Sequence, residues 1–558
     1  MKAHRLAGNI VDLHARRIYP GIVEWRDGRI VRLVATPGRR YRHYIAPGFV
    51  DAHIHIESSM LPPAEFARWA VVHGTVATVS DPHEIANVLG VAGVDYMVRD
   101  GRRTPFKFNF GAPSCVPATN FETAGATLDA RTVARLLARP DIKYLSEVMN
   151  FPGVLARDPS LLAMIRAARR HRKPVDGHAP GLRGRTAARY AAAGITTDHE
   201  CFTLAEARDK LQAGMKILIR EGSAARNFAA LAPLLHSHAE RCMFSCDDLH
   251  PDLLMQRHLD EHVRRALRHG ADRFNVLRCA SVNPVEHYRL DVGQLRAGDP
   301  ADFIIFEGWA DLRVRRTYLR GELVARDGRT LLPRQRSKAP NKFKATPRRV
   351  EDFTCRAGSP HPAGKEGGIS DPAVQLNVIE AINGQLVTRH GRERGRLKDG
   401  VLVTDPMRDV LKLAVVNRYA RRAPAALAFI RGFGLRRGAI ASSVAHDSHN
   451  IVAVGVDDAA LCAAVNLVIK HRGGISVVAG SRRAVLPLPI AGLMADADGR
   501  VVARRYSALD GMAKKLGSKL DAPFMTLAFM ALLVIPDLKL SDRGLFSAAR
   551  WGFVPLVD

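Results

Sequence analysis

Cysteine is scarce in this chain, and its seven residues are scattered without paired spacing. An odd, unpaired set argues against a disulfide framework. Long apolar runs are missing too: no stretch approaches the roughly 20 apolar residues that a membrane-spanning helix needs. The N-terminus, MKAHRLAGNIVDLHARRIYPG, lacks the uninterrupted apolar segment of a secretory signal. We therefore expect a cytoplasmic protein that does not associate with membranes.

Acidic residues are also few: the chain has 55 of them and 83 lysines and arginines, which gives a net charge of +28. Clustered basic residues can neutralise nucleic-acid phosphates, so a basic nucleic-acid-binding protein on a barrel scaffold is the alternative from another functional class. The charges are spread along the chain, and only 334–349, RQRSKAPNKFKATPRR, is a concentrated run, typical of a linker. No zinc finger, RNA-recognition motif or helix-turn-helix pattern is evident. We interpret the charge as a solvated surface and expect no specific nucleic-acid partner.

The length of 558 residues indicates two or three domains, because one hydrophobic core does not grow this large. Short alternating strands near the N-terminus close on an RDGR hairpin signal, and the same pattern returns at 299–331. We predict a small β-sandwich-like domain built from both flanks, 1–47 and 291–335. Beyond the linker, strands, glycine turns and short helices predict a C-terminal α/β or α+β domain over 350–558.

The middle of the chain, 48–290, alternates strand-like apolar runs with helical stretches rich in Ala and Arg. Repetition of strand and helix predicts parallel strands, and about eight such units in roughly 240 residues match a (β/α)₈ TIM-type barrel. The predicted strands are GFVDAHIH, GTVATVSD, FKFNFGAP, IKYLSEVMN, KPVDGHAPG, GITTDHE, MKILIREG and RCMFSCDD.

Two histidines stand two residues apart in PGFVDAHIHIESSM at 47–60. Side chains alternate between the faces of a strand, so His53 and His55 project from one face, about 7 Å apart. That spacing lets both imidazoles converge on one metal ion. Taken alone, the motif is explained more simply by a surface strand that carries two histidines.

Polar residues collect at the ends of the predicted barrel strands, where the catalytic side chains of such barrels lie. One histidine at a strand end is more often structural, but four histidines and two carboxylates, all at one end of one barrel, would be a large coincidence. Imidazole and carboxylate groups are ligands of Zn²⁺, Mn²⁺ and Fe²⁺, and six are enough for two ions. The strand-end residues are His53, His55, Asp81, His83, Glu84, Glu147, His178, His199, Asp247 and Asp248.

The chain resembles the amidohydrolase superfamily, whose members place a His-x-His on the first barrel strand and an Asp on the last. APGFVDAHIHIESSM and NPVEHYRLDVGQLRAGDPADFIIFE carry this resemblance. More narrowly, the chain is similar to the adenine deaminases of bacterial type, over 6–331 and about 370–500. The narrower resemblance rests on SDPHEIANVLG, EVMNFPGV, DGHAPG, DHE, RGAIASSVAHDSHNIVAVG and LPLPIAGLM.

The resemblance implies a centre of two divalent metal ions, with manganese expected first and iron or zinc as alternatives. Many amidohydrolases bridge the two ions with a carboxylated lysine. Here Lys143 lies four residues before the strand end, and Glu147 supplies a negative charge without modification, so we expect the glutamate to be the bridge. The implied ligands are His53, His55, Glu147, His178, His199 and Asp247.

The implied reaction is hydrolytic deamination of adenine to hypoxanthine and ammonia, in purine salvage. Asp247 is expected to act as general base and then acid, with Asp248 on the opposite face of the strand. Glu84 or His83 is expected to give ring nitrogen N1 its proton. The alternative within enzymes is another purine or a cyclic amide as substrate. We also expect a homo-oligomer, the usual state of soluble assemblies.

Two features have a structural reading beside the functional one. Asp81 is expected to cap the following helix, with Pro82 in its first turn, which would leave His83 and Glu84 free. The stretch HDSHN carries His446, Asp447 and His449 between two apolar strands. A hydrogen-bonded turn, closure of the adenine pocket and binding of a further ion all stay open for this stretch.

Overall fold

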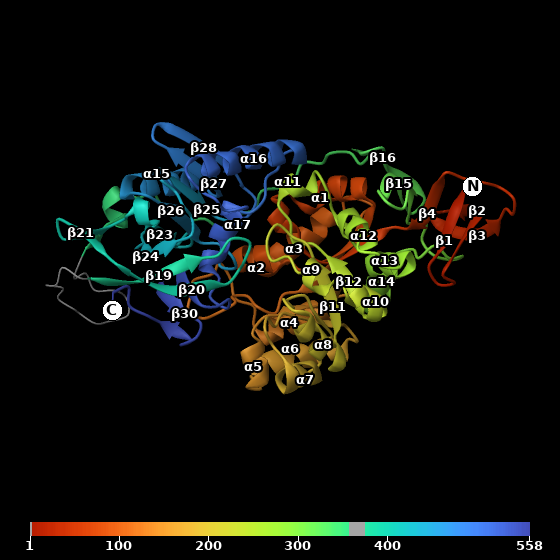
Figure 1. The fold of residues 1–558 in the computed structure, drawn as a ribbon, viewed down its shortest axis with the longest axis horizontal. Helices are drawn as coiled ribbons and strands as arrows, with labels where there is room; N and C mark the ends of the chain where they lie inside the picture. Colours follow the sequence, from red (N-terminus) through yellow and green to blue (C-terminus); the bar gives the residue numbers. More distant parts are fainter. Residues whose placement is uncertain (1–2, 357–373, 558) are drawn as a thin grey trace.

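The computed structural model describes residues 3–356 and 374–557. Three parts of the predicted domain ranges lie outside the described residues: 1–2, 357–373 and 558. The molecule is elongated, with a β-sheet near the N-terminus at one end, a barrel in the middle and a sheet-and-helix unit at the other end (Figure 1). No helix in the described part is long and apolar enough to cross a membrane.

Eight parallel strand positions form the barrel, and they are the eight predicted from the sequence. Between β9 and β10, Thr196 N donates to Val175 O at 2.8 Å. The last position closes the ring in two pieces, because β12 pairs with β11 whereas β13 pairs with β5. The strands are β5 (Phe49–His55), β6 (Thr75–Ser80), β7 (Lys107–Ala112), β8 (Ile142–Val148), β9 (Val175–Gly177), β10 (Thr197–Asp198), β11 (Lys216–Arg220), β12 (Cys242–Ser245) and β13 (Asp247–Asp248).

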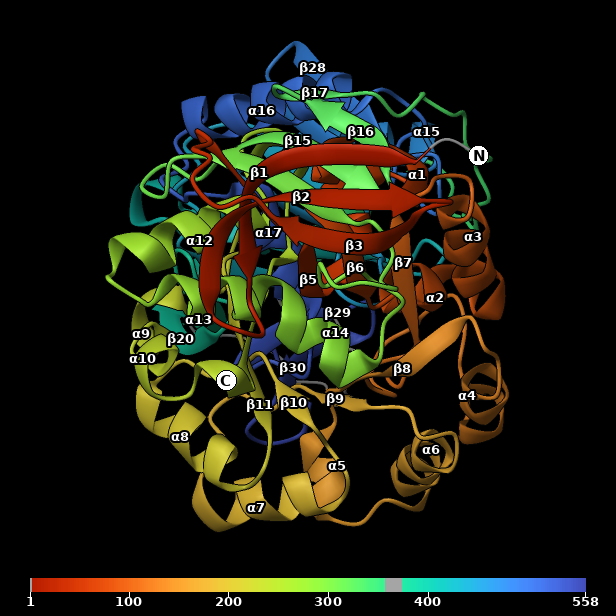
Figure 2. The same cartoon turned by 90° about the vertical axis from the view of Figure 1, so that its right-hand side faces the viewer.

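Helices alternate with these strands and cover the outside of the barrel (Figure 2). Strands covered in this way are buried on both faces, which is why β5 and β6 have no exposed residue. Acidic N-caps start three of these helices: Asp129 accepts from Thr132 N, Asp158 from Leu161 N, and Asp272 from Asn275 N. The helices are α1 (Pro63–Ala70), α2 (His83–Leu89), α3 (Val91–Gly101), α4 (Ala130–Leu137), α5 (Phe151–Leu155), α6 (Pro159–Arg170), α7 (Gly184–Ala192), α8 (Leu204–Gln212), α9 (Phe228–Leu231), α10 (Leu234–Ser237), α11 (Pro251–Leu254), α12 (Leu259–Arg268), α13 (Arg273–Leu277) and α14 (Asn283–Tyr288).

The two flanks of the barrel meet in one continuous eight-stranded sheet, as predicted from the repeated hairpin pattern. The junction is antiparallel, with Ile305 opposite Ile45. Trp25 packs edge-on against Phe303 and Tyr318, so residues of both flanks share a core. The strands are β1 (His4–Asp12), β2 (Arg17–Arg26), β3 (Arg29–Ala35), β4 (His43–Pro47), β14 (Phe303–Glu307), β15 (Arg313–Leu319), β16 (Glu322–Arg326) and β17 (Arg329–Thr330).

The C-terminal unit is built on a mostly antiparallel sheet, which selects α+β from the two predicted classes. Residues 334–349, the predicted linker, contain no helix or strand. Small sheets and helices α15 (Asp458–Lys470), α16 (Gly499–Lys515) and α17 (Pro523–Ala528) complete the unit. The main strands are β19 (Gln375–Ala381), β20 (Thr388–Arg394), β23 (Leu411–Val416), β24 (Ala426–Arg431), β25 (Ala439–Ser442), β26 (Ile451–Gly455), β27 (Gly474–Ala479) and β28 (Arg482–Pro487); the small sheets hold β18 (Cys355–Arg356), β21 (Arg396–Lys398) and β22 (Val401–Val403), and β29 (Leu538–Ser541), β30 (Gly544–Ser547) and β31 (Gly552–Phe553).

This C-terminal unit packs on the barrel at the end where the strands carry their polar residues. Asn450 Nδ2 donates to Thr123 O at 2.9 Å, and Gly499 N donates to Glu65 Oε1 at 2.8 Å. The exact domain boundaries stay a prediction. The packing means that the C-terminal unit forms one wall of the barrel mouth.

Candidate active site

The six predicted metal ligands come together in one buried cluster at the C-terminal ends of the barrel strands. The ring closure by β13 brings the last strand beside the first, so residues almost 200 positions apart meet. Buried and within reach of one another lie His53 and His55 of β5, Glu147 of β8, His178 after β9, His199 after β10 and Asp247 of β13.

Glu147 lies at the centre of the cluster. Its Oε1 is 3.3 Å from His55 Nε2, while its Oε2 is 2.7 Å from His178 Nδ1 and 3.2 Å from His199 Nε2. Burial opposes its ionisation, but these histidines hold the pKa of Glu147 well below its usual range. The alternative bridge, Lys143, turns away, and its Nζ donates to Pro140 O at 3.0 Å.

His53, His55 and Asp247 form the other half of the cluster. The Nε2 atoms of the two histidines are 3.2 Å apart, and Asp247 Oδ1 lies 3.2 Å from His55 Nε2 and 3.7 Å from His53 Nε2. His55 Nδ1 is 3.3 Å from the backbone oxygen of Asp81. This contact favours a proton on Nδ1, and in that tautomer Nε2 has a free lone pair for a metal ion. Burial, with His199 and His55 nearby, holds the pKa of His53 well below its usual value, so its imidazole is neutral.

These donors fit two divalent cations. Imidazole nitrogens and carboxylate oxygens converge at 2.7–3.3 Å around Glu147, which presents one oxygen to each half of the cluster. A neutral imidazole and an ionised carboxylate are the forms in which these groups bind metals. Several groups of donor atoms among the described residues lie within 4.8 Å of one another, among them His53, His55 and Asp247; His53, Glu147 and His199; His178, His199 and Glu200; and His55, Asp81, His83 and Glu147.

Arg220 and Glu200 belong to the site, although the sequence reasoning did not select them. Arg220 Nη1 donates to Glu200 Oε1 at 2.6 Å and also contacts Asp247 Oδ2, and its Nη2 donates to Glu200 Oε2 at 2.9 Å. Burial opposes the ionisation of Asp247, but Arg220 and the histidines hold its pKa well below its usual range. Arg220 ends strand β11, so the strand-end rule could have found it.

The start of helix α2 and the residues just before it bring Asp81, His83 and Glu84 to the same site. The predicted cap is wrong in part, because the helix begins at His83 and Pro82 precedes it. The Asp81 carboxylate accepts from His83 N at 3.1 Å and lies 3.0 Å from the ring Nδ1 of His83. Capping therefore does not leave His83 free: Asp81 orients its ring, and His83 Nε2 lies 3.3 Å from Glu84 Oε1.

Asp248 does not point to the opposite side of the strand, contrary to the prediction. Asp247 has a φ of 57°, in the left-handed region, which breaks the alternation of side chains along β13. Both carboxylates consequently line one pocket. Asp248 Oδ1 accepts a hydrogen bond from Ser58 Oγ at 2.5 Å, so it faces the first barrel strand's loop rather than the metal donors.

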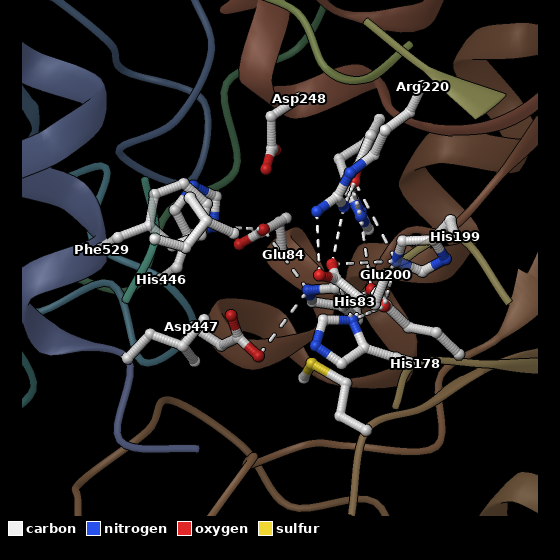
Figure 3. Close-up of a pocket in the computed structure, with 16 residues that line it drawn as sticks. His83, Glu84, His178, His199, Glu200, Arg220, Asp248, His446, Asp447 and Phe529 are labelled. Atoms are coloured by element: carbon white, nitrogen blue, oxygen red, sulfur yellow. Dashed lines mark hydrogen bonds and ion pairs between the residues drawn. The ribbon is translucent and has the colours of Figure 1, made fainter. Parts of the chain in front are cut away.

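The HDSHN stretch, open in the sequence reasoning, lies at the barrel mouth. His446 and Asp447 line the same pocket as the metal cluster, opposite His178 and His199 (Figure 3). The apolar wall of this pocket combines residues of the barrel and of the C-terminal unit: Met149, Leu386, Phe529 and Leu532.

Comparison with known proteins follows the same division of the chain. Residues 44–324 match the amidohydrolase family, and residues 385–551 match the adenine deaminase C-terminal domain. An adenine deaminase of Salinibacter ruber is 57% identical over 98% of this chain and 98% of its own length. The chain belongs to the adenine deaminase family. An adenine deaminase from a Sulfurovum species is 54% identical over 98% of this chain and 99% of its own length. One from Methanosarcina mazei is 49% identical over 98% of this chain and 98% of its own length.

Family membership makes the barrel the metal-dependent amidohydrolase unit of an adenine deaminase. The C-terminal match includes His446, Asp447, His449 and Phe529, which border the cavity or contact a residue that lines it. The second domain of this family of enzymes therefore forms part of the pocket in this chain.

Proposed function

We propose that this protein hydrolyses adenine to hypoxanthine and ammonia, with a centre of two divalent cations. The observation that carries the proposal is the buried cluster of imidazoles and carboxylates around Glu147, roofed by a domain that matches adenine deaminases. Apolar and polar side chains together line the cavity, a combination that suits a flat purine ring with polar ring nitrogens.

The metal ions would be held by the six predicted ligands, with Glu147 between them. Manganese is the ion we propose first, and iron or zinc would suit the same donors. When bound, two such cations supply Lewis acidity, which lowers the pKa of a water to around 7 and so provides hydroxide at neutral pH. Glu200 and Arg220 border this centre and set the local charge.

Asp247 is proposed as the general base and acid. Its carboxylate is buried and ionised, so it can accept the proton of the attacking water and pass it to the departing ammonia. Arg220 contacts Oδ2 and leaves Oδ1 facing the histidines, which orients the carboxylate. Glu84 and His83 also line the cavity, and His83 lies beside the metal donors, with its Nδ1 3.4 Å from Glu147 Oε1. One of these two groups would give the ring nitrogen N1 its proton.

Purified protein supplied with Mn²⁺ and given adenine tests the proposal. We expect loss of adenine absorbance, equimolar hypoxanthine and ammonia, and close to two bound ions per chain by elemental mass spectrometry. Turnover of another purine or a cyclic amide, with none of adenine, would favour the alternative substrate. Salt-sensitive binding to DNA or RNA by a metal-free protein would favour the nucleic-acid alternative.

Three further expectations belong with this proposal. We propose that the net charge of +28 serves no specific nucleic-acid partner, that the protein acts in the cytoplasm and that it forms a homo-oligomer. Light scattering at several concentrations measures the last of these directly.

A further inference from the structure

The Glu84 carboxylate is held by two histidines from the other domain. Its Oε1 lies 2.5 Å from His446 Nδ1, and its Oε2 contacts His449 Nε2. Glu84 belongs to helix α2 of the barrel, whereas the histidines lie between β25 and β26, more than 360 positions along the chain. None of the three side chains is more than 3% exposed.

The loop that carries the histidines is itself fixed by hydrogen bonds. Tyr419 Oη donates to Ser448 O at 2.6 Å, and Asn450 Nδ2 donates to the barrel at Thr123 O. Ala445 N donates to His449 Nδ1 at 3.2 Å. Because Nδ1 accepts this bond, the proton of a neutral His449 must be on Nε2, the atom that faces Glu84.

His446 is held on its other side by an aromatic ring. Phe529 stacks on it, with ring centroids 4.3 Å apart and an angle of 15° between the ring planes. This stack leaves Nδ1 pointing at Glu84, and both rings line the cavity. His446 Nδ1 and His449 Nε2 thus each contact a different oxygen of one carboxylate, which restricts both its position and its rotation.

We propose that His446 and His449 are positioning residues, which hold Glu84 in the orientation that serves the substrate ring. The C-terminal domain then contributes positioning residues to the active site, in addition to forming part of the pocket wall. This inference rests on the proposed function, because Glu84 is the group proposed to face the ring. It selects a role for the HDSHN stretch in which no further ion is needed.

The charges around Glu84 set the direction of the effect of removing these histidines. Burial opposes the ionisation of Glu84, but His446, His449 and His83, which face it, hold its pKa well below its usual range. The acids Glu57 and Asp248 also face it and oppose its ionisation. Loss of a histidine donor should therefore raise the pKa of Glu84. The limb of the pH profile that Glu84 controls should move to higher pH, whichever form of the carboxyl the reaction requires.

The experiment pairs variants that remove a donor with variants that keep it. His446→Leu and His449→Leu have no donor, whereas His446→Asn keeps a nitrogen near Nδ1 and His449→Gln keeps one near Nε2. We expect each Leu variant to lose about 10²-fold in kcat, the usual cost of a displacement of about 1 Å, with metal content unchanged. The Asn and Gln variants should recover much of the loss. His471→Leu, at the end of α15, is the matched control and should resemble the wild type.

A double-mutant cycle with Glu84→Gln separates positioning from general folding damage. If the histidines act through Glu84, His446→Leu should have little further effect in the Glu84→Gln background. Equal losses in both backgrounds, or Leu variants with wild-type kcat and pH profile, would overturn the inference while the deamination by the wild type stands. Failure of the wild type to deaminate adenine would instead refute the proposed function.

Discussion

Replacing Glu147 with Gln should empty the metal centre while changing the shape of the site very little. The carboxylate meets His55, His178 and His199 at 2.7–3.3 Å, and it would contact both cations. Removing one partner from a buried charged network costs about 3–5 kcal/mol. At about 1.4 kcal/mol per tenfold change, this corresponds to a loss of about 10²–10⁴-fold in cation affinity.

Elemental analysis and adenine turnover, measured on the same samples, test this prediction. We expect Glu147→Gln to retain fewer than two ions and to lose nearly all activity, and Glu147→Asp to fall between this variant and the wild type. Lys143→Met is the control and should keep both ions, because Lys143 Nζ points away to Pro140. Two ions and normal turnover in Glu147→Gln would refute the bridge and return Lys143 to consideration.

Other substitutions probe the groups around the centre. Asp247→Asn should keep part of the metal while kcat falls about 10²–10⁴-fold, and Asp248→Asn should mainly raise KM; equal, mild effects would argue against both roles. Arg220→Met should raise the pKa of Asp247, and move the acid limb of kcat/KM up by about 1–3 pH units, with a smaller shift in Arg220→Lys. Burial lowers the pKa of Lys539 to about 7, so between about pH 7 and 10 the unfolded state binds a proton that the folded state has lost. Stability should therefore rise as the pH is raised over this range, and Lys539→Met should show a smaller rise in Tm.

The barrel and most of the site could be predicted because they follow local rules. Strands buried on both faces read as apolar runs, and parallel strands place their polar ends on one side. His53 and Glu147 therefore met as expected, although they lie far apart in the sequence. Arg220 was missed for a chemical reason: it obeys the same strand-end rule, but it is not a metal ligand.

What could not be predicted depends on single backbone angles and on contacts between domains. The left-handed φ of Asp247 turns Asp248 into the pocket, and period-two alternation cannot foresee such a break. The contact of Glu84 with His446 joins segments more than 360 positions apart, and no periodic pattern links them. The residue types of Glu84 and His446 indicated that they could take part in chemistry, but only the packing of the two domains showed that they contact each other.

The same histidines that would bind cations can instead bind protons, and this sets the last prediction. Burial opposes protonation of His199, yet Glu147, Asp247 and Glu200 raise its pKa to about 9 when no cation offsets their charge. Metal binding should therefore release protons from the cluster, and affinity should fall as the pH is lowered. Titration calorimetry with Mn²⁺ in buffers of different ionisation enthalpy measures this release. If the heat does not depend on the buffer, the histidines are already neutral before the cations bind, and the charge balance around Glu147 must come from elsewhere.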